Sequence, residues 1–462
     1  MTAIILSSVL FAAAPSPRAA AVAHSHFIRS PKSSFEKCRD NLASWIRGND
    51  VKAFGIGSPW SAAQAAAMRR CEGPDRDAYY AGTLKGDFLF AEDVYATLAA
   101  MSNACPGVTF FADNETPKNR YGHLWYIGYT PIVPGWHDYS QDRRTAFTKA
   151  ELDDPSLDKN AITGKAHYRR PYSEVVAEQR SHGALAIWAH PTSWWLDGGR
   201  FVTNIAADMP AQLLMDGGLD GLTVMGYDPY HRHYEELWFH LLDMGYRIPG
   251  LAEQDCSPAH GIVGKKDERI LNYIPDCDHA PTVEEFKSAV RNFRTTMSSG
   301  PDLRMLSLSA DATSVTVRCY IAPSPGEKTL SRVEVLGRGG KIRALLKDAG
   351  EGTREFRFAR EGGDTWFVAR CFGEGYGDYE KRPQQDVRVF ALTNPMWLPD
   401  SPLPPAPVVP AVPYMENPEV RKLMDYLAEG RFRDGRPELK PGEVPAEAFR
   451  IEDFRKALQK HP

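Results

Sequence analysis

The sequence contains no Cys-x-x-Cys pair, because its seven cysteines are scattered along 462 residues. This absence leaves a zinc ribbon or a thioredoxin-like redox site without support. The sequence also lacks a basic run, and its formal net charge of −4 argues against a surface that binds nucleic-acid phosphates. No apolar stretch reaches the roughly 20 residues that a transmembrane helix requires. There is no internal repeat.

What is present is the composition of a soluble globular protein, with 43% apolar and 25% charged residues. A chain of 462 residues is too long for one ordinary domain, so we expect two or three. Cys319 and Cys371 lie in two apolar runs that we expect to form neighbouring strands. They can form a disulfide, but two buried free thiols are the interpretation that we favour.

The first residues resemble an export signal. Ala3 to Ala14, AIILSSVLFAAA, are apolar and end in small residues, which is typical of the hydrophobic region of a signal peptide with a cleavage site near Ala14. We therefore expect a leader over residues 1–19 and a periplasmic or secreted protein. The residues before this run include no Lys or Arg. A mis-assigned start codon, or an N-terminal strand in a cytoplasmic protein, is the alternative.

Residues 20–301 alternate between apolar runs and helical patterns. Patterns such as YSEVVAEQRSHG and YEELWFHLLDMG separate the runs, which indicates a parallel sheet covered by helices. Glu115, His190 and Asp255 stand where three of the runs end. In α/β barrels and open sheets, sites are built at the carboxyl ends of the strands. We expect strands within residues 51–58, 107–115, 123–129, 184–191, 221–227 and 247–255.

Residues 302–398 have a different pattern. About seven alternating strands with Gly and Asp in their turns predict a small all-β sandwich domain. The region has no histidine and no catalytic cluster, so we interpret it as an accessory domain. Residues 399–462 begin with the proline-rich segment PDSPLPPAPVVPAVP and continue with two short helical patterns, which predicts a linker and a helical tail.

Any site built from several histidines must lie in the first part of the chain, because twelve of the thirteen histidines lie between His24 and His279. His24 and His26 form an H-x-H pattern, and on a strand both side chains would point to the same face. Two imidazoles so placed can bind one borderline divalent cation, and a carboxylate such as Glu115 can bridge to a second. The candidate metal ligands are His24, His26, Glu115, His123, His190 and Asp255.

Several motifs occur in an order that resembles one superfamily. They are HSH near the start, GVTFFADNE followed by YGHLWYIGY, GALAIWAHP, GLDGLTVMG, WFHLLDMGYRIPGLAEQD and FRTTMSSGPDL. Together they resemble the polymerase-and-histidinol-phosphatase (PHP) superfamily of metallohydrolases, in particular its carbaryl-hydrolase-like CehA/McbA branch. The resemblance covers residues 20–400. It implies a distorted (β/α)7 barrel with metal ions at its C-terminal mouth, a following β-domain, and the six metal ligands named above.

The chain departs from the family pattern at two places. The T-D-H motif after the second strand is replaced by GIGSPW, and the D-x-H motif reads Asp255-Cys256-Ser257. Family members with three metals use these two motifs for the third, so both losses affect one site. The resemblance therefore implies a binuclear centre with two divalent ions: zinc, manganese or iron. One ion would be bound by His24, His26, Glu115 and Asp255, and the other by Glu115, His123 and His190.

Two cations that share Glu115 would activate water as a hydroxide nucleophile. We assign catalytic roles to Glu115, Asp255 and His260, the last as a partial replacement for the missing D-x-H histidine. The candidates for substrate binding follow strand ends near the predicted mouth: His231, His233, Trp194 and Arg200. The structural alternatives are a solvated loop for the two histidines and core packing for the tryptophan.

The sequence thus predicts a metal-dependent hydrolase that acts on a small-molecule phosphoester or on a carboxylic or carbamate ester. It indicates no nucleic-acid partner and does not define an oligomeric state. The alternative is a non-catalytic protein with a degenerate metal pocket, which uses the β-sandwich to bind a carbohydrate or a partner. Fold does not separate these two functions, but metal content does.

Overall fold

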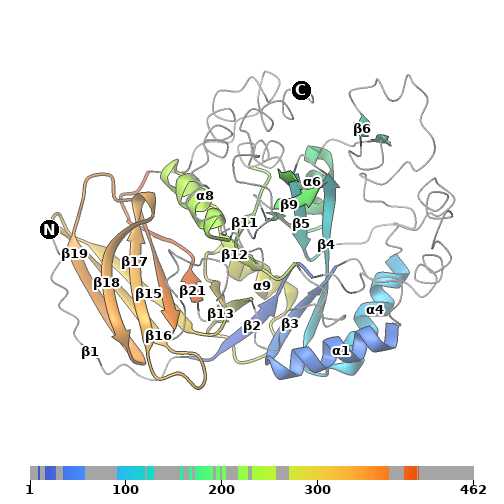
Figure 1. Ribbon diagram of the computed structural model, residues 1–462, viewed down its shortest axis with the longest axis horizontal. Helices are drawn as coiled ribbons and strands as arrows, with labels where there is room; N and C mark the ends of the chain where they lie inside the picture. Colours follow the sequence, from blue (N-terminus) through green and yellow to red (C-terminus); the bar gives the residue numbers. More distant parts are fainter. Residues whose placement is uncertain are drawn as a thin grey trace.

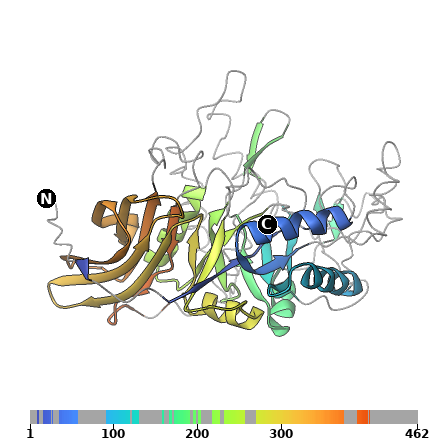
Figure 2. The same cartoon turned by 90° about the horizontal axis from the view of Figure 1, so that it is seen from below.

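The computed structural model describes residues 9–10, 16–25, 27, 35–57, 91–119, 122–129, 157–159, 166–168, 172–190, 194–197, 200–203, 217–226, 231–255, 270–373, 390–402 and 404 (Figure 1). His26, His260 and nearly all of the predicted tail lie outside these ranges. The chain is of the α/β class. Figure 2 shows from a second direction that the orange strands gather at one end of the molecule and the blue helices at the other.

Seven strands that precede residue 254 are consecutive neighbours in a 14-stranded mixed sheet. β2 (Arg18–Val22) is hydrogen-bonded to β3 (Val51–Ile56) on one side and to β13 (Leu271–Pro275) on the other, so the segment before His24 is a structural strand. Each of the six predicted runs contains a strand. In spatial order the seven are β12 (Gly250–Glu253), β11 (Gly221–Gly226), β8 (Leu185–Trp188), β5 (Gly122–Ile127), β4 (Thr109–Asn119), β3 (Val51–Ile56) and β2 (Arg18–Val22).

The prediction of an all-parallel sheet is wrong for β5, which runs antiparallel to both β4 and β8. Only two residues separate β4 from β5, whereas parallel neighbours need a crossover of about a dozen residues or more. The other pairs among the seven strands are parallel. The result is a mixed sheet with five α-helices in the described ranges, which does not by itself define a (β/α)7 barrel.

The described helices follow ordinary rules of burial and capping. α1 (Phe35–Gly48) buries Cys38, Leu42 and Ile46, whose spacing of four residues places them on one stripe. α9 (Val283–Arg291) begins at a capping box between Thr282 and Glu285. None of the helices in the described ranges has the length and apolar character of a transmembrane helix. The others are α4 (Ala91–Ala104), α6 (Tyr172–Ser181) and α8 (His231–Asp243).

One apolar cluster collects side chains from both ends of the seven-strand series. Ala21 lies on β2, Trp125 and Ile127 lie on β5, and Leu251 lies on β12, and all four belong to this cluster. Trp125 and Ile127 are two residues apart and therefore face the same side of their strand. Because β2 and β12 are the first and last of the seven, the sheet must curl around this cluster. The carboxyl ends of the parallel strands, β2 and β12 among them, consequently converge.

The long sheet continues past residue 301, the predicted boundary, through β13, β14 (Thr296–Ser298) and β21 (Phe390–Thr393). Its far end holds β20 (Trp366–Gly373), β22 (Met396–Trp397), β17 (Leu330–Gly337) and β18 (Lys341–Ala349). A separate four-stranded sheet holds β1 (Val9–Leu10), β19 (Gly352–Ala359), β16 (Ser314–Ala322) and β15 (Asp302–Ala310). A second apolar cluster contains Val317 and Phe356 of the smaller sheet and Val333 and Phe367 of the larger. The two sheets therefore pack on each other.

Cys319 and Cys371 both lie in this second cluster and are free cysteines, as the thiol interpretation predicts. Burial raises the pKa of the Cys319 thiol to about 12, and it raises the pKa of Cys371 as well. Three short segments complete the described elements: the hairpin of β6 (Leu157–Lys159) and β7 (Ala166–Tyr168), the hairpin of β9 (Trp194–Asp197) and β10 (Arg200–Thr203), and the 3-10 turn η4 (Arg338–Gly340).

Candidate metal centre

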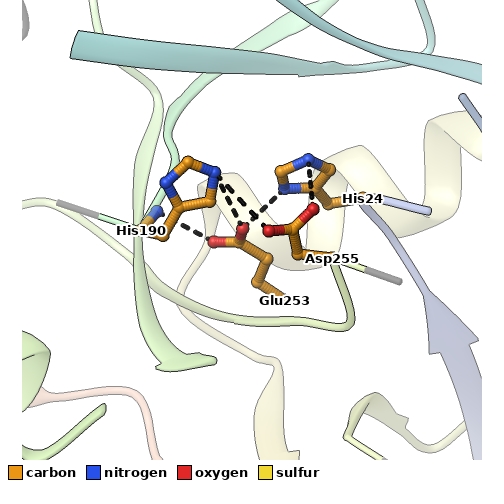
Figure 3. Close-up of side chains that lie close together, drawn as sticks. All are labelled: His24, His190, Glu253 and Asp255. Carbon is orange, nitrogen blue, oxygen red and sulfur yellow. Dashed lines mark hydrogen bonds and ion pairs between the residues drawn. The ribbon is translucent and has the colours of Figure 1, made fainter. Parts of the chain in front are cut away.

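Five side chains of the kinds that bind metal ions converge from the ends of three strands and from within a fourth. His24 follows β2, Glu115 lies on β4, His190 follows β8, Glu253 ends β12, and Asp255 comes two residues later. Four of the five are buried, and the Asp255 side chain is 19% exposed. Figure 3 shows His24, His190, Glu253 and Asp255 pointing toward one another. The convergence brings together residues that are up to 231 positions apart (255 − 24).

The distances within this group are those of a potential coordination site. One ligand atom from each of His24, His190, Glu253 and Asp255 can be chosen so that all lie within 4.8 Å of one another. His24 Nδ1 lies 2.7 Å from Glu253 Oε1. The Glu115 carboxylate contacts both rings, with Oε1 2.8 Å from His190 Nε2 and Oε2 3.4 Å from His24 Nε2. We refer to these five residues as the His–carboxylate cluster.

The backbone at three cluster residues is left-handed. The φ angle is 58° at His24, 21° at His190 and 32° at Asp255. On β2 and β8, Ala21 and Ile187 face the inner cluster, so strict alternation would turn His24 and His190 away from it. The left-handed conformation breaks the alternation after each strand has ended. The prediction that His24 lies on a strand, sharing a face with His26, is therefore wrong at His24, because β2 ends at Val22.

A second layer of contacts orients the cluster. Glu253 Oε2 accepts the backbone N–H of His190 at 2.9 Å and also accepts the Thr223 hydroxyl. Asp113 Oδ2 accepts the backbone N–H of His24 at 2.5 Å. The His24 ring stacks between Trp125 and His190, with ring centroids 5.3 Å and 5.6 Å away. Such outer contacts fix the rotamers of metal ligands and tune their basicity.

The carboxylates create a strongly negative potential at the cluster. Burial alone lowers the pKa of His190, but Glu253 and Glu115 outweigh this effect and raise that pKa to about 9. Burial likewise opposes protonation of His24, yet Glu253, Glu115 and Asp255 raise its pKa well above the usual value. Burial raises the pKa of Asp113 to about 7, against the opposing charge of His24. The same potential that favours a protonated imidazole also favours a bound cation.

The donor set fits a divalent metal ion. Two imidazole nitrogens with three carboxylates suit borderline cations such as Zn²⁺, Mn²⁺ or Fe²⁺. Burying three carboxylates together is costly unless cations neutralise them. Such a cluster can bind a metal ion.

The sequence-predicted ligands divide into three groups. His24, Glu115, His190 and Asp255 are brought together. His123 lies on β5 opposite Lys118 of β4, near the same edge of the sheet, but its side chain lies outside the described part, as does all of His26. The rings of His24 and His190 stack on each other with centroids 5.6 Å apart, and the predicted division of the two histidines between separate ions stays a prediction.

Two of the three predicted catalytic residues, Glu115 and Asp255, lie in the cluster, whereas His260 lies outside the described ranges. The four predicted substrate residues are placed only by their backbone. His231 and His233 belong to the first turn of α8, which begins five residues after β11 ends. In the hairpin of β9 and β10, Trp194 pairs with Thr203, and Arg200 pairs with Asp197. The side chains of these four residues lie outside the described part.

Glu253 was missed by the sequence reasoning. It lies two residues before Asp255 in GLAEQD, at the end of a predicted strand. Residues two apart on a strand share a face, so the same periodicity argument applied to His24 and His26 would have paired Glu253 with Asp255. The D-x-H motif begins at Asp255 and does not include Glu253.

Comparisons with known proteins identify no family. No family model matches the sequence, and no curated protein matches it. Endonuclease Q, solved in complex with a 27-mer duplex substrate with an abasic lesion, is 16% identical with a TM-score of 0.31, and the match covers 60% of this chain and 57% of that one. This chain thus spans just over half the length of Endonuclease Q.

Two further solved structures are similar at the same level. PsfC from Pseudomonas syringae PB-5123 is 10% identical with a TM-score of 0.31, and the match covers 59% of this chain and 88% of that one. The endo-beta-1,4-mannanase from Thermotoga petrophila is 11% identical with a TM-score of 0.24, over 82% and 97% of the two chains. Similarities of this size assign neither a family nor an activity.

Proposed function

We propose that this protein is a metal-dependent hydrolase that acts on a small-molecule phosphoester or on a carboxylic or carbamate ester. The observation that carries the proposal is the convergence of two imidazoles and three carboxylates at one edge of the sheet. These residues come from four strands that are distant in the sequence. A chance cluster of acidic residues would be exposed, and its side chains would lack hydrogen bonds such as those that Glu253 accepts from His190 and Thr223.

We also propose that the chain is a PHP-type metallohydrolase with a barrel-like closure of its first seven strands. Four of the six ligands that the motif comparison suggests lie in the cluster, which supports this assignment. The inner apolar cluster shared by β2 and β12 supports the closure. If the protein is exported, cleavage must come before Arg18, because β2 begins there and is bonded on both edges.

The roles of the residues follow from their contacts. A divalent cation held by the cluster would supply Lewis acidity, which polarises an ester oxygen and acidifies water. Glu115 divides its two carboxylate oxygens between His190 and His24 and so suits a shared ligand. Glu253 is fixed by the His190 N–H and the Thr223 hydroxyl. Asp255 is the most exposed member, so it is placed to accept a proton from an approaching water or substrate.

Metal analysis tests the proposal. Wild-type protein, freed of metal and reloaded with Zn²⁺ or Mn²⁺, is compared with His190→Ala, Glu253→Gln and the control His279→Ala, whose side chain is 55% exposed and lies outside the cluster. We expect about two equivalents in the wild type, as in binuclear hydrolases, the same in the control, and a loss of metal in both cluster variants. Wild-type protein that binds no metal would contradict the proposal and favour the non-catalytic alternative.

Activity is then measured on the same four proteins. Generic aryl phosphodiesters, phosphomonoesters and aryl carboxylic or carbamate esters separate the two ester classes. We expect metal-dependent hydrolysis of at least one class by the wild type and by His279→Ala. Hydrolysis that persists in metal-free protein, or in His190→Ala at the wild-type rate, would place the chemistry elsewhere.

A further inference from the structure

β12, the strand that carries Glu253 and leads to Asp255, lies at the end of the sheet order, and among the described strands it pairs with β11 alone. Its other edge presents the backbone groups of alternate residues, Gly250 and Ala252. Both residues are buried, so water cannot satisfy these groups. Unpaired buried backbone groups are costly and rare in folded proteins.

Two asparagine side chains meet this edge in the same way. Asn272 Oδ1 accepts the N–H of Ala252 at 2.8 Å, and its Nδ2 donates to the carbonyl of Ala252 at 2.8 Å. Asn394 Oδ1 accepts the N–H of Gly250 at 2.7 Å, and its Nδ2 donates to the carbonyl of Gly250 at 3.0 Å. Each carboxamide thus replaces the peptide group that a neighbouring strand would offer.

Gln254, directly after β12, continues the series. Its N–H lies 3.5 Å from the carbonyl of Ala23, directly before His24. Its side chain accepts the N–H of Ile270 at 3.0 Å. The backbone or side chains of Gly250, Ala252 and Gln254 are therefore bonded to groups outside β11. The alternate residues are Leu251, Glu253 and Asp255, and the last two belong to the His–carboxylate cluster.

The two asparagines come from different parts of the chain. Asn272 lies on β13, whereas Asn394 follows β21 and lies 144 residues from Gly250. Asn394 is itself held, because its Nδ2 also donates to the carbonyl of Thr295 at 2.9 Å. Asn272 is fully buried, and Asn394 is 3% exposed. The C-terminal β-region, from β15 to β22 (Asp302 to Trp397), thus reaches the strand that leads into the His–carboxylate cluster.

We propose that Asn272 and Asn394 are positioning residues of the metal centre: they fix the register and path of β12 so that the Glu253 and Asp255 carboxylates face His24 and His190. This inference rests on the proposed metal site. It makes the C-terminal β-region a contributor to the site instead of an accessory domain, since one of the two residues comes from it. Neither asparagine contacts the metal ligands' donor atoms.

The test compares Asn394→Ala and Asn272→Ala with two matched controls. Asn292→Ala removes an exposed asparagine that also donates to a backbone carbonyl, that of Ser288 at 2.8 Å. Val317→Ala weakens the core between the two β-sheets without touching β12. The affinity for Zn²⁺ or Mn²⁺ is measured by competition with a chromophoric chelator, and thermal stability is measured on the same samples.

We expect Asn272→Ala and Asn394→Ala to bind the metal about 10- to 100-fold more weakly than the wild type. This is the range found when outer contacts of metal ligands are removed. Asn292→Ala should bind as the wild type does. Val317→Ala should lose thermal stability without losing affinity, which separates a positioning role from general destabilisation. Unchanged affinity in folded Asn394→Ala and Asn272→Ala would overturn the proposal.

Amide hydrogen exchange in metal-free wild-type protein decides the proposal independently of metal binding. We expect the N–H groups of Gly250 and Ala252 to exchange as slowly as those of the paired strands β8 and β11, because both have buried acceptors. The N–H groups of Gly250 and Ala252 should exchange faster than in the wild type in Asn394→Ala and in Asn272→Ala, or in the one of these two variants that folds. Fast exchange in the wild type would overturn the inference. Wild-type protein that binds no metal but shows this protection would overturn the proposed function and leave the β12 contacts established.

Discussion

At the scale of single residues, the cluster depends on backbone conformations that ordinary side chains rarely adopt. A left-handed conformation at a non-glycine residue costs roughly 1–3 kcal/mol, and three ligand residues carry it. The chain keeps His24, His190 and Asp255 at positions where glycine would be more stable. Such strain at a cluster of donors is what a site selected for binding, and not for stability, would show.

Substitution of His24 separates the cost of the strained backbone from the loss of the imidazole ligand. His24→Ala and His24→Gly remove the same imidazole, but glycine tolerates the φ of 58° without a Cβ clash. We expect metal-free His24→Gly to be more stable than metal-free His24→Ala by about 1 kcal/mol, and both to lose metal affinity. Urea unfolding of the metal-free proteins measures the difference. If the alanine variant is equally stable, the backbone at His24 is not left-handed.

Gly57 allows the segment after β2 to approach β3 closely. Its N–H donates to the Ser25 carbonyl at 3.0 Å, and a Cβ at this position would lie 2.2 Å from the same oxygen. We expect Gly57→Ala to displace Ser25 and with it His24, and to cost about 1–3 kcal/mol as other overpacking changes do. Metal affinity should fall in parallel. Gly48→Ala, at the end of α1, where no atom lies within 4 Å of the added Cβ, should lower neither quantity.

At the scale of elements, β11 and β12 act together to hold one carboxylate. Thr223 of β11 is fully buried, and its hydroxyl donates to Glu253 Oε2. Thr223→Val keeps the shape of the side chain but removes this donor. We expect metal affinity to fall about tenfold, the lower end for lost outer contacts, whereas Thr223→Ser, which keeps the hydroxyl, should stay close to the wild type. Equal affinities of the valine and serine variants would show that the hydroxyl does not position Glu253.

The strand positions and most members of the His–carboxylate cluster could be predicted from the sequence, because both have local signals. The six apolar runs became strands, and a polar residue at the end of a run marked Glu115 and His190. The antiparallel direction of β5 was also accessible, since the seven residues between the predicted runs 107–115 and 123–129 are too few for a parallel crossover. The hydrogen bonds from Asn272 and Asn394 to the edge of β12 could not be predicted from the sequence. A side-chain amide that replaces a strand has no periodic pattern, and one of the two contacts spans 144 residues.

At the scale of the whole molecule, α8 connects the seven strands to the C-terminal β-region. Figure 1 shows this helix between the orange strands and β11 and β12. Arg370 of β20 donates to Glu235 of α8 at 2.6 Å and to Glu334 of β17 at 2.7 Å. Asp243, at the end of α8, accepts the indole N–H of Trp366 at 3.0 Å. The helix is thus bonded to the β-region near both of its ends.

Removal of Arg370 should be strongly destabilising. Glu235 and Glu334 are 2% and 0% exposed, so Arg370→Met would leave two buried carboxylates without this partner. Breaking a buried ion pair in this way costs about 3–5 kcal/mol, and we expect a loss of that size in denaturant unfolding. Arg357→Met on β19, whose side chain is 65% exposed, should cost little, because exposed pairs contribute less than about 1 kcal/mol. A small loss for Arg370→Met would mean that water reaches the pair.

The apolar core also crosses between the two regions. One cluster contains Trp188 and Leu222 from the first strands, Trp238 from α8, and Trp366 and Phe372 from β20. Regions that share a core cannot unfold separately without exposing it, so we expect one calorimetric transition for the metal-free protein. Leu222→Ala and Phe372→Ala, each costing about 2–5 kcal/mol, should shift that whole transition, although they lie in different regions. Two transitions, each moved by only one of the variants, would show instead that the regions are independent domains, and Asn394 could then not hold β12 in place.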